Sequence, residues 1–80
     1  KVEALMFKIK SDSRVVRIPL MELKVRDNLL IVFIVRKGKL IFPEGRDVIL
    51  PEDRVAVVTT HHNFQDIDDI LEPRGNEPRL

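Results

Sequence analysis

The sequence predicts a small α+β domain. We expect a two-layer sandwich with a mostly antiparallel sheet, a short helix after the first strands and a C-terminal helix. Short apolar segments alternate with polar turns along the chain, and the last apolar residues follow a helical spacing. Eighty residues make one domain, which hides only ~60% of its unfolded surface. Since there is no cysteine to form a disulfide, we expect tight packing or burial of a face against a second copy or a neighbouring domain.

The first part of the chain favours two short strands joined by a polar turn. Residues 3–10 alternate between apolar and more polar side chains, as in a strand with one buried face. The inward positions of this strand are Leu5, Phe7 and Ile9. Residues 11–13 form a turn, and residues 14–18 predict a second extended piece with Val16 and Ile18 facing inward.

A short helix is predicted next. Pro19 suits the first turn of a helix because it lacks a backbone N–H that would otherwise be unpaired. Leu20 and Leu23 are three residues apart and share one helical face, so we expect one or two helical turns over residues 19–23.

A long hairpin organises the centre of the chain. Residues 29–35 are seven apolar residues in a row, which suits a strand packed on both faces and is far short of the ~20 residues that cross a bilayer. Lys37 and Gly38 reverse the chain, since glycine adopts the positive φ of a two-residue hairpin turn. Residues 40–42 form the returning strand.

Two further turns and two extended segments follow. Pro43 and Gly45 occupy the second and fourth positions of a type I turn over residues 42–45. Residues 48–50 are briefly extended, and residues 55–59 predict another largely apolar strand.

The C-terminal helix is predicted from a cap and an apolar stripe. Asn63 is the expected N-cap, with Asp66 in the capping-box position. The stripe consists of Phe64, Ile67, Ile70 and Leu71. Pro73 ends the helix, so we expect a folded domain over residues 1–72 and a flexible tail over residues 73–80.

Composition and motifs give little support to catalysis. The formal net charge of +1 argues against a dedicated DNA-binding protein. The three glycines are scattered, so neither a phosphate-binding loop nor a dinucleotide fingerprint is present, and no nucleophile elbow occurs. The acidic residues near the C-terminus suit the solvated face of the last helix better than acid–base chemistry. We therefore expect no enzyme.

Adjacent histidines offer a candidate metal site. His61 and His62 point to opposite faces if they lie on a strand, so they chelate one ion poorly, although Asp66 is within reach of His62 in sequence. The alternative is a polar junction between a strand and a helix, which we favour.

Four basic residues near the hairpin are candidate anion ligands. Arg36, Lys37 and Lys39 either bind phosphate or nucleic acid or keep the hairpin tip soluble. Arg26 lies at the mouth of the hairpin, beside the predicted helix over residues 19–23, and is harder to explain by solubility alone.

The order of several short motifs resembles the C-terminal TrkA-type domain, also called the RCK C-terminal subdomain. The match covers roughly residues 2–71. Its segments are Ile18-Pro19-Leu20, Glu22-Leu23, Asn28-Leu29-Leu30-Ile31, Ile34-Val35-Arg36-Lys37-Gly38, Ile41-Phe42-Pro43-Glu44-Gly45 and Glu52-Asp53-Arg54-Val55-Ala56-Val57-Val58.

The resemblance implies a regulatory domain rather than an enzyme. Such domains usually form homodimers and follow a Rossmann-type nucleotide-binding domain on the cytoplasmic side of a potassium channel or transporter. In some members the dimer cleft binds cyclic di-AMP, and those members carry an asparagine–isoleucine pair at the start of the long strand. Leu30 and Ile31 hold the matching positions here, so the isoleucine is kept and the asparagine is not.

The resemblance also implies a set of ligand contacts. The residues that fall where such a cleft is lined are Ile18, Pro19, Lys24, Arg26, Leu30, Ile31 and Pro43. Arg26 or Lys24 is expected to hold an anionic group of a cyclic dinucleotide or another small anion, and Ile18, Ile31 and Pro43 are expected to form apolar walls. No other cofactor is implied.

Three hypotheses therefore stand. The first is a cytoplasmic, ligand-sensing and dimerising domain of a potassium uptake or efflux system. The second is a purely structural dimerisation module that binds no small molecule, and the third is nucleic-acid binding through Arg36, Lys37 and Lys39. Because the chain begins with Lys1, we also expect it to be a piece of a longer protein.

Overall fold

A four-stranded antiparallel sheet forms one layer of the domain. The computed structural model describes residues 1–73. The strands are β1 (Glu3–Lys8), β2 (Leu29–Arg36), β3 (Lys39–Ile41) and β4 (Arg54–Thr59). Their order across the sheet is β1-β4-β2-β3, and every pairing is antiparallel. The predicted antiparallel sheet is therefore confirmed. The flexible tail that we expected from residue 73 onward falls, from residue 74, outside the described residues.

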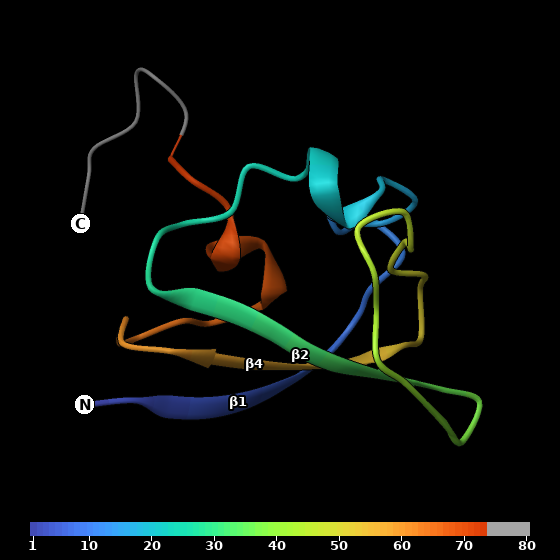
Figure 1. Ribbon diagram of the computed structural model, residues 1–80, viewed down its shortest axis with the longest axis horizontal. Helices are drawn as coiled ribbons and strands as arrows, with labels where there is room; N and C mark the ends of the chain where they lie inside the picture. The colour runs from blue at the N-terminus through green and yellow to red at the C-terminus, as the bar shows by residue number, and fades with distance from the viewer. Residues whose placement is uncertain (74–80) are drawn as a thin grey trace.

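The second layer consists of turns, not of the helices that we predicted. The element expected over residues 19–23 is a single 3-10 turn, η1 (Leu20–Glu22), and the expected C-terminal helix is also a single 3-10 turn, η2 (Ile67–Ile70). Figure 1 shows both turns and the connecting loops on one side of the sheet.

The C-terminal helix is absent because the cap lies three residues later than predicted. Asn63 has a φ of 70° and is not helical, whereas Asp66 is the N-cap and forms a capping box with Asp69. Leu71 then returns to extended backbone and makes an antiparallel bridge with Val25. The apolar spacing that indicated a helix is therefore satisfied by one short turn and an extended segment, both held by tertiary contacts.

The core lies between the inner face of the sheet and the layer of turns. Side chains of β4 alternate, with Val55, Val57 and Thr59 buried and the intervening residues more exposed. The buried apolar residues are Ile9, Val15, Ile34, Ile49, Val55, Val57, Ile67 and Ile70. Strands β2 and β4 and the turn η2 thus contribute to one cluster, against which Phe7 of β1 and Leu20 of η1 pack.

One extended piece is oriented differently from the prediction. Val16 was expected to face inward, but Val15 is the fully buried residue and Val16 is only half-buried. A positive φ of 62° at Arg17 breaks the strand after a single parallel bridge between Val16 and Ile49. Residues 14–18 therefore form an isolated bridge instead of a strand.

The central hairpin closes as predicted. Lys37 and Gly38 have φ values of 52° and 77°, the two positive values that a type I′ turn requires. A β-bulge lies at Val32, between the pairs Ile31–Val57 and Phe33–Ala56. This extra residue shifts the alternation by one position, so that Ile34 reaches the core.

The turn after the hairpin is displaced from its predicted place. We expected it over residues 42–45, but it is closed two residues later, where the Asp47 N–H donates to the Glu44 carbonyl at 2.9 Å. The Asp47 carboxylate also accepts from the Glu44 N–H at 2.6 Å, so the side chain of Asp47 decides where the chain turns.

The opposite side of the sheet is not covered by any described residue. We call this surface the outer face; its central residues are Ala4, Met6, Leu30, Phe33, Ala56 and Val58. Leu30 and Met6 are 61% and 53% exposed, which is unusual for large apolar side chains in a domain of this size. Within residues 1–73 no helix is long and apolar enough to cross a membrane.

Candidate functional site

Arg26 is held in place by the turn η2. Its backbone N–H donates to the Ile70 carbonyl at 2.8 Å, and its side-chain Nε donates to the Asp69 carbonyl at 2.7 Å. The guanidinium carbon lies 5.9 Å from the centroid of the Phe64 ring, within range of a cation–π contact. These three contacts fix the direction of the side chain.

The terminal guanidinium nitrogens are the part of Arg26 that has no partner in the described residues. Within residues 1–73, neither terminal guanidinium nitrogen of Arg26 makes a hydrogen bond, and no carboxylate forms an ion pair with it. A guanidinium that presents its terminal N–H groups is suited to bidentate binding of a phosphate or carboxylate. Its position is fixed before any ligand arrives, which lowers the entropy that binding would cost.

Lys24 lies two residues before Arg26, and its backbone bonds to the residues that follow η2. Its carbonyl accepts from the Glu72 N–H at 2.8 Å, while its side chain is exposed. Together with the bridge between Val25 and Leu71, this bond pairs residues 24–26 with residues 70–72. The two predicted cationic contacts therefore sit on a locally paired segment next to η2.

The predicted apolar contacts Ile18, Pro19 and Pro43 lie in another part of the turn layer. The residues that flank Ile18 and Pro19 are bonded to the turn that follows Pro43: Arg17 N–H to Ile49 O and Leu20 N–H to Asp47 O, both at 2.9 Å. All three predicted contacts are half-buried. The three cavities beside Ile67, on the outer face and beside Asn28 are lined by other residues.

The last two predicted contacts, Leu30 and Ile31, lie on opposite faces of β2. Leu30 pairs with Val58 on the outer face, whereas Ile31 pairs with Val57 and packs against the core. Because neighbouring residues on a strand point to opposite sides, one copy of the chain cannot place both in the same site.

Arg36 was predicted to lie at the hairpin tip, either to bind an anion or to keep the tip soluble. In the structure it instead links the hairpin to other parts of the fold. Its Nε and Nη2 donate to the two carboxylate oxygens of Asp53 at 2.9 and 2.8 Å, and Nη2 also donates to the Val48 carbonyl. Asp53 is buried and accepts a further bond from the Leu50 N–H at 2.8 Å. The hydrogen bond to Asp53 raises the pKa of Arg36 above its ordinary value, against the opposing effect of burial.

This bidentate pair removes one of the three cations proposed for nucleic-acid binding. Lys37 and Lys39 remain exposed at the tip. In the sequence this pair is indicated only indirectly, because Asp53 precedes a largely apolar segment at the end of a proline turn. Nothing in the spacing identifies Arg36 as its partner.

The two histidines make polar contacts at the junction after β4. The His61 ring donates from Nε2 to the Asp27 carbonyl at 2.8 Å and stacks on Phe64, with ring centroids 5.7 Å apart. His62 Nδ1 lies 2.6 Å from a carboxylate oxygen of Glu3. Within the described residues, no group of three or more metal-binding side chains converges. Phe64 contacts both His61 and Arg26, whereas the predicted helix placed it only in an apolar stripe.

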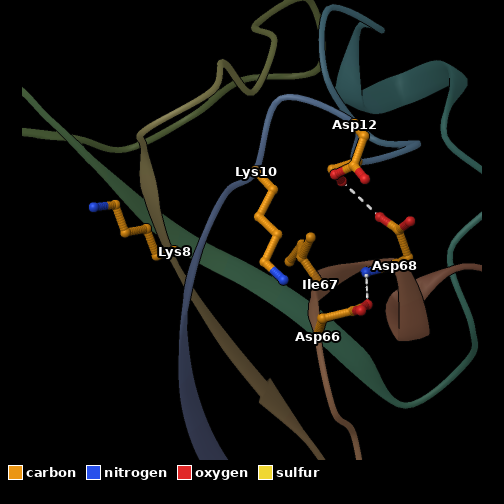
Figure 2. A pocket seen from close by; sticks show the side chains of 7 residues that line it. Lys8, Lys10, Asp12, Asp66, Ile67 and Asp68 are labelled. Atoms are coloured by element: carbon orange, nitrogen blue, oxygen red, sulfur yellow. Dashed lines mark hydrogen bonds between the residues drawn. The ribbon is translucent and has the colours of Figure 1, made fainter.

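A small pocket lies between the first turn of the chain and η2. Figure 2 shows the side chain of Lys10 reaching toward Ile67 and Asp66, whereas Lys8 points away. The volume of this pocket is about 40 Å³, enough for a few water molecules. The Asp68 carboxylate accepts a hydrogen bond from the Ser13 hydroxyl at 2.6 Å. The residues around the pocket therefore link η2 to the first turn of the chain and do not form an open site.

The fold and the site together define a small antiparallel sheet domain that presents one oriented arginine. The chain belongs to the TrkA-C domain family, because the family model matches residues 5–72. Domains of this family are regulatory parts of potassium transport systems, in which they associate with other domains and with membrane transporters.

A solved structure supports the same fold. The structure described as "Structure of RCK domain with cda" has a TM-score of 0.60 and 21% sequence identity; the match covers 72% of this chain and 80% of that one. No curated protein matches the sequence.

Proposed function

We propose that this domain is a cytoplasmic sensor of a small anionic ligand in a potassium uptake or efflux system, with Arg26 as the anchor of the anion. The observation that carries the proposal is the state of its guanidinium group, which is fixed through Nε and has no bonded partner at its terminal nitrogens within residues 1–73. Lys24 is close enough in the chain to add a second positive charge.

The ligand site is proposed to be completed by a second copy of the chain. Ile18, Pro19 and Pro43 would supply apolar walls, and their backbone neighbours are bonded to the turn after Pro43, whereas Arg26 is bonded to η2. Ile31 lies on the side of the sheet that carries these loops, whereas Leu30 lies on the other side. A homodimer that brings two turn layers together is the simplest arrangement in which all the loop-side residues meet one ligand.

Such a ligand would act by shifting a population. A ligand that prefers one arrangement of the dimer shifts the equilibrium toward that arrangement, and with it the state of the attached Rossmann-type domain and transporter. The size of the shift is limited by the difference between the ligand's affinities for the two arrangements. The similar structure contains a ligand named "cda", which makes cyclic dinucleotides the first class to test.

The test measures ligand-linked thermal stabilisation. Cyclic di-AMP, ATP and inorganic phosphate are added separately to the protein, and the midpoint of unfolding is recorded. A ligand present at a hundred times its Kd stabilises the folded state by ~2.7 kcal/mol. We expect one of these probes to raise the midpoint and Arg26→Ala to abolish the rise, while the exposed control Arg46→Ala keeps it.

The result also separates the alternatives. If none of the probes shifts the midpoint or gives heat in calorimetry, the domain is the purely structural module. If Arg26→Ala and Arg46→Ala weaken binding equally, the anion is attracted by net charge and not held by Arg26.

A further inference from the structure

His61 lies just after β4, next to the segment that carries Arg26. Its backbone N–H donates to the Thr59 hydroxyl oxygen at 3.0 Å. The N–H of the preceding residue, Thr60, donates to the Asn28 carbonyl at 3.2 Å. Figure 1 shows this junction, in orange, beside the start of β2. These bonds fix the backbone around His61, so the fold sets the place of its ring.

The hydrogen bond made by the ring identifies its tautomer. Nε2 lies 2.8 Å from the carbonyl oxygen of Asp27, and a carbonyl oxygen can only accept. Nε2 therefore carries a hydrogen whether the ring is neutral or charged. Nδ1 of His61 has no hydrogen-bond partner within residues 1–73, so it is the nitrogen that gains or loses the proton.

Phe64 links the His61 ring to Arg26. The ring centroids of His61 and Phe64 are 5.7 Å apart at an interplanar angle of 17°, and the guanidinium carbon lies 5.9 Å from the same Phe64 centroid. Asp27, whose carbonyl holds the imidazole, directly follows Arg26 in the chain. The separation of the imidazole and the guanidinium is thus comparable to the Debye length, ~10 Å at 0.1 M salt. A charge on His61 therefore acts on an anion held by Arg26.

The other charged groups near His61 do not neutralise it. On the segments packed around it they are Lys1, Glu3, Lys24, Arg26, Asp27, His62, Asp66, Asp68 and Asp69. Glu3 is bonded to His62 at 2.6 Å, and the three carboxylates in and before η2 each accept a backbone N–H or a hydroxyl. Within the described part of the chain, the Asp27 carboxylate forms no ion pair. A protonated His61 thus keeps its charge unpaired.

We infer that His61 is a second contact of the anion site and that its protonation strengthens the binding of an anion by Arg26. The inference rests on the proposed function, because it concerns the same site. Among the charged side-chain types around the site, histidine is the one that gains its charge between pH 8 and pH 5. With the ring neutral, Arg26 binds the anion without His61; with the ring protonated, Nδ1–H is a further donor and the site has two cations.

The sign of the effect follows from these charges. Affinity for an anion rises as the pH falls, because the added charge is positive. Coupling between two bound species is reciprocal, so a bound anion favours the protonated ring to the same degree. Occupancy of the site then depends on the proton concentration as well as on the ligand concentration.

The first test measures anion binding by calorimetry at pH 5.5 and pH 7.5 at constant ionic strength. The probes are sulfate and cyclic di-AMP, whose charges do not change over this range; inorganic phosphate is unsuitable because it titrates near these pH values. We expect the wild type to bind roughly fivefold more tightly at pH 5.5, the effect of one added charge in a partly solvated site.

Three variants assign the effect to one ring. His61→Gln keeps a donor for the Asp27 carbonyl without a titrating charge, so its affinity should equal that of the wild type at pH 7.5 and should not change with pH. His61→Arg has a permanent charge and should bind at both pH values as the wild type does at pH 5.5. His62→Gln removes the neighbouring histidine and is the matched control, which should keep the pH dependence.

A second measurement needs no ligand. Nitrogen-15 shifts in NMR identify the protonated nitrogen of each imidazole, and we expect hydrogen on Nε2 in the neutral ring of His61. The Arg26 Nε–H signal should move with the same midpoint as His61 and should stay in place in His61→Gln. Hydrogen on Nδ1, or an Arg26 signal that follows the titration of His62, would contradict the inference.

The outcomes separate this inference from the proposed function. Binding that depends on Arg26 but is equal at the two pH values overturns the role of His61 and leaves the anion sensor intact. A pH dependence that persists in His61→Gln, or that disappears in His62→Gln, also overturns it, because another group then takes up the proton. If neither probe binds at either pH, the proposed function and the inference both fail. Circular dichroism confirms that each variant is folded, and His61→Asn replaces His61→Gln if that variant is not.

Discussion

Two arginines of this domain begin from the same kind of anchor and end in opposite states. Arg36 and Arg26 each use Nε in a hydrogen bond, to the Asp53 carboxylate and the Asp69 carbonyl respectively. Arg36 also donates from Nη2 to the Asp53 carboxylate and to the Val48 carbonyl, whereas the terminal nitrogens of Arg26 make no hydrogen bond within residues 1–73.

The difference shows that the role of a basic residue depends on whether the fold supplies a counterion for it. The partner of Arg36 is a buried carboxylate, so the charge is balanced inside the fold and the pair joins the hairpin to the turn before β4. Within residues 1–73, the partners of Arg26 are an uncharged carbonyl and an aromatic face, so its positive charge is oriented but not balanced by a carboxylate of that part of the chain. The first is a structural link, and the second is available to an anion.

Removing the counterion of Arg36 should have the largest effect on stability. Asp53→Ala leaves the guanidinium without its partner and the Leu50 N–H without an acceptor, so we expect a loss of about 2–4 kcal/mol. Urea unfolding measures it, with the exposed Asp12→Ala as the matched control. A loss no greater than that of the control would mean that the pair contributes nothing beyond solvation.

Replacing Arg36 by lysine should have an intermediate effect that depends on pH. Arg36→Lys keeps a charge but cannot form both bonds to Asp53, so we expect a loss of about 1–2 kcal/mol at pH 8. The hydrogen bond to Asp53 raises the pKa of Arg36 above its ordinary value, so its contribution is fully present below that ordinary value and is lost only as the pH rises through the folded-state value.

A lysine has an ordinary pKa of ~10.4, so the contribution of the variant side chain begins to fall at a lower pH. Unfolding of both proteins at pH 8 and pH 11 should therefore show a larger gap at pH 11. An unchanged gap would indicate that charge at this position does not matter.

Truncating Arg26 should have the smallest effect on stability. Arg26→Ala removes one bond to a carbonyl and a contact with Phe64 from a partly exposed side chain, so we expect a loss of about 1 kcal/mol or less. The same urea titration measures it. A loss as large as that of Asp53→Ala would make Arg26 a structural link too, and the contrast between the two arginines would disappear.

The strands and the hairpin were predictable because their signals are local. Alternation in residues 3–10, the apolar segment of β2 and the positive-φ pair Lys37–Gly38 each need only neighbouring residues. The helix over residues 63–71 was predicted wrongly because its spacing also fits a short 3-10 turn followed by a bridge to Val25. A stripe of four apolar residues does not reveal where its partners lie.

The candidate site was predictable only in part for the same reason. Arg26 was identified by its position at the mouth of the hairpin, but its contacts with Asp69 and Phe64 join residues some forty positions apart. Leu30 and Ile31 were assigned to one cleft by the family resemblance, whereas the strand directs them to opposite faces.

The sequence alone determined the strands of the central hairpin, the first strand and the strand over residues 55–59, and where the hairpin turns, since these depend on backbone preference and period. Only the tertiary structure decided the strand order, the capping of η2, the pairing of Arg36 with Asp53 and the contacts that orient Arg26. Those features arise when segments distant in the chain meet, and the free energy of such contacts depends on distance, burial and partner, which no local pattern specifies.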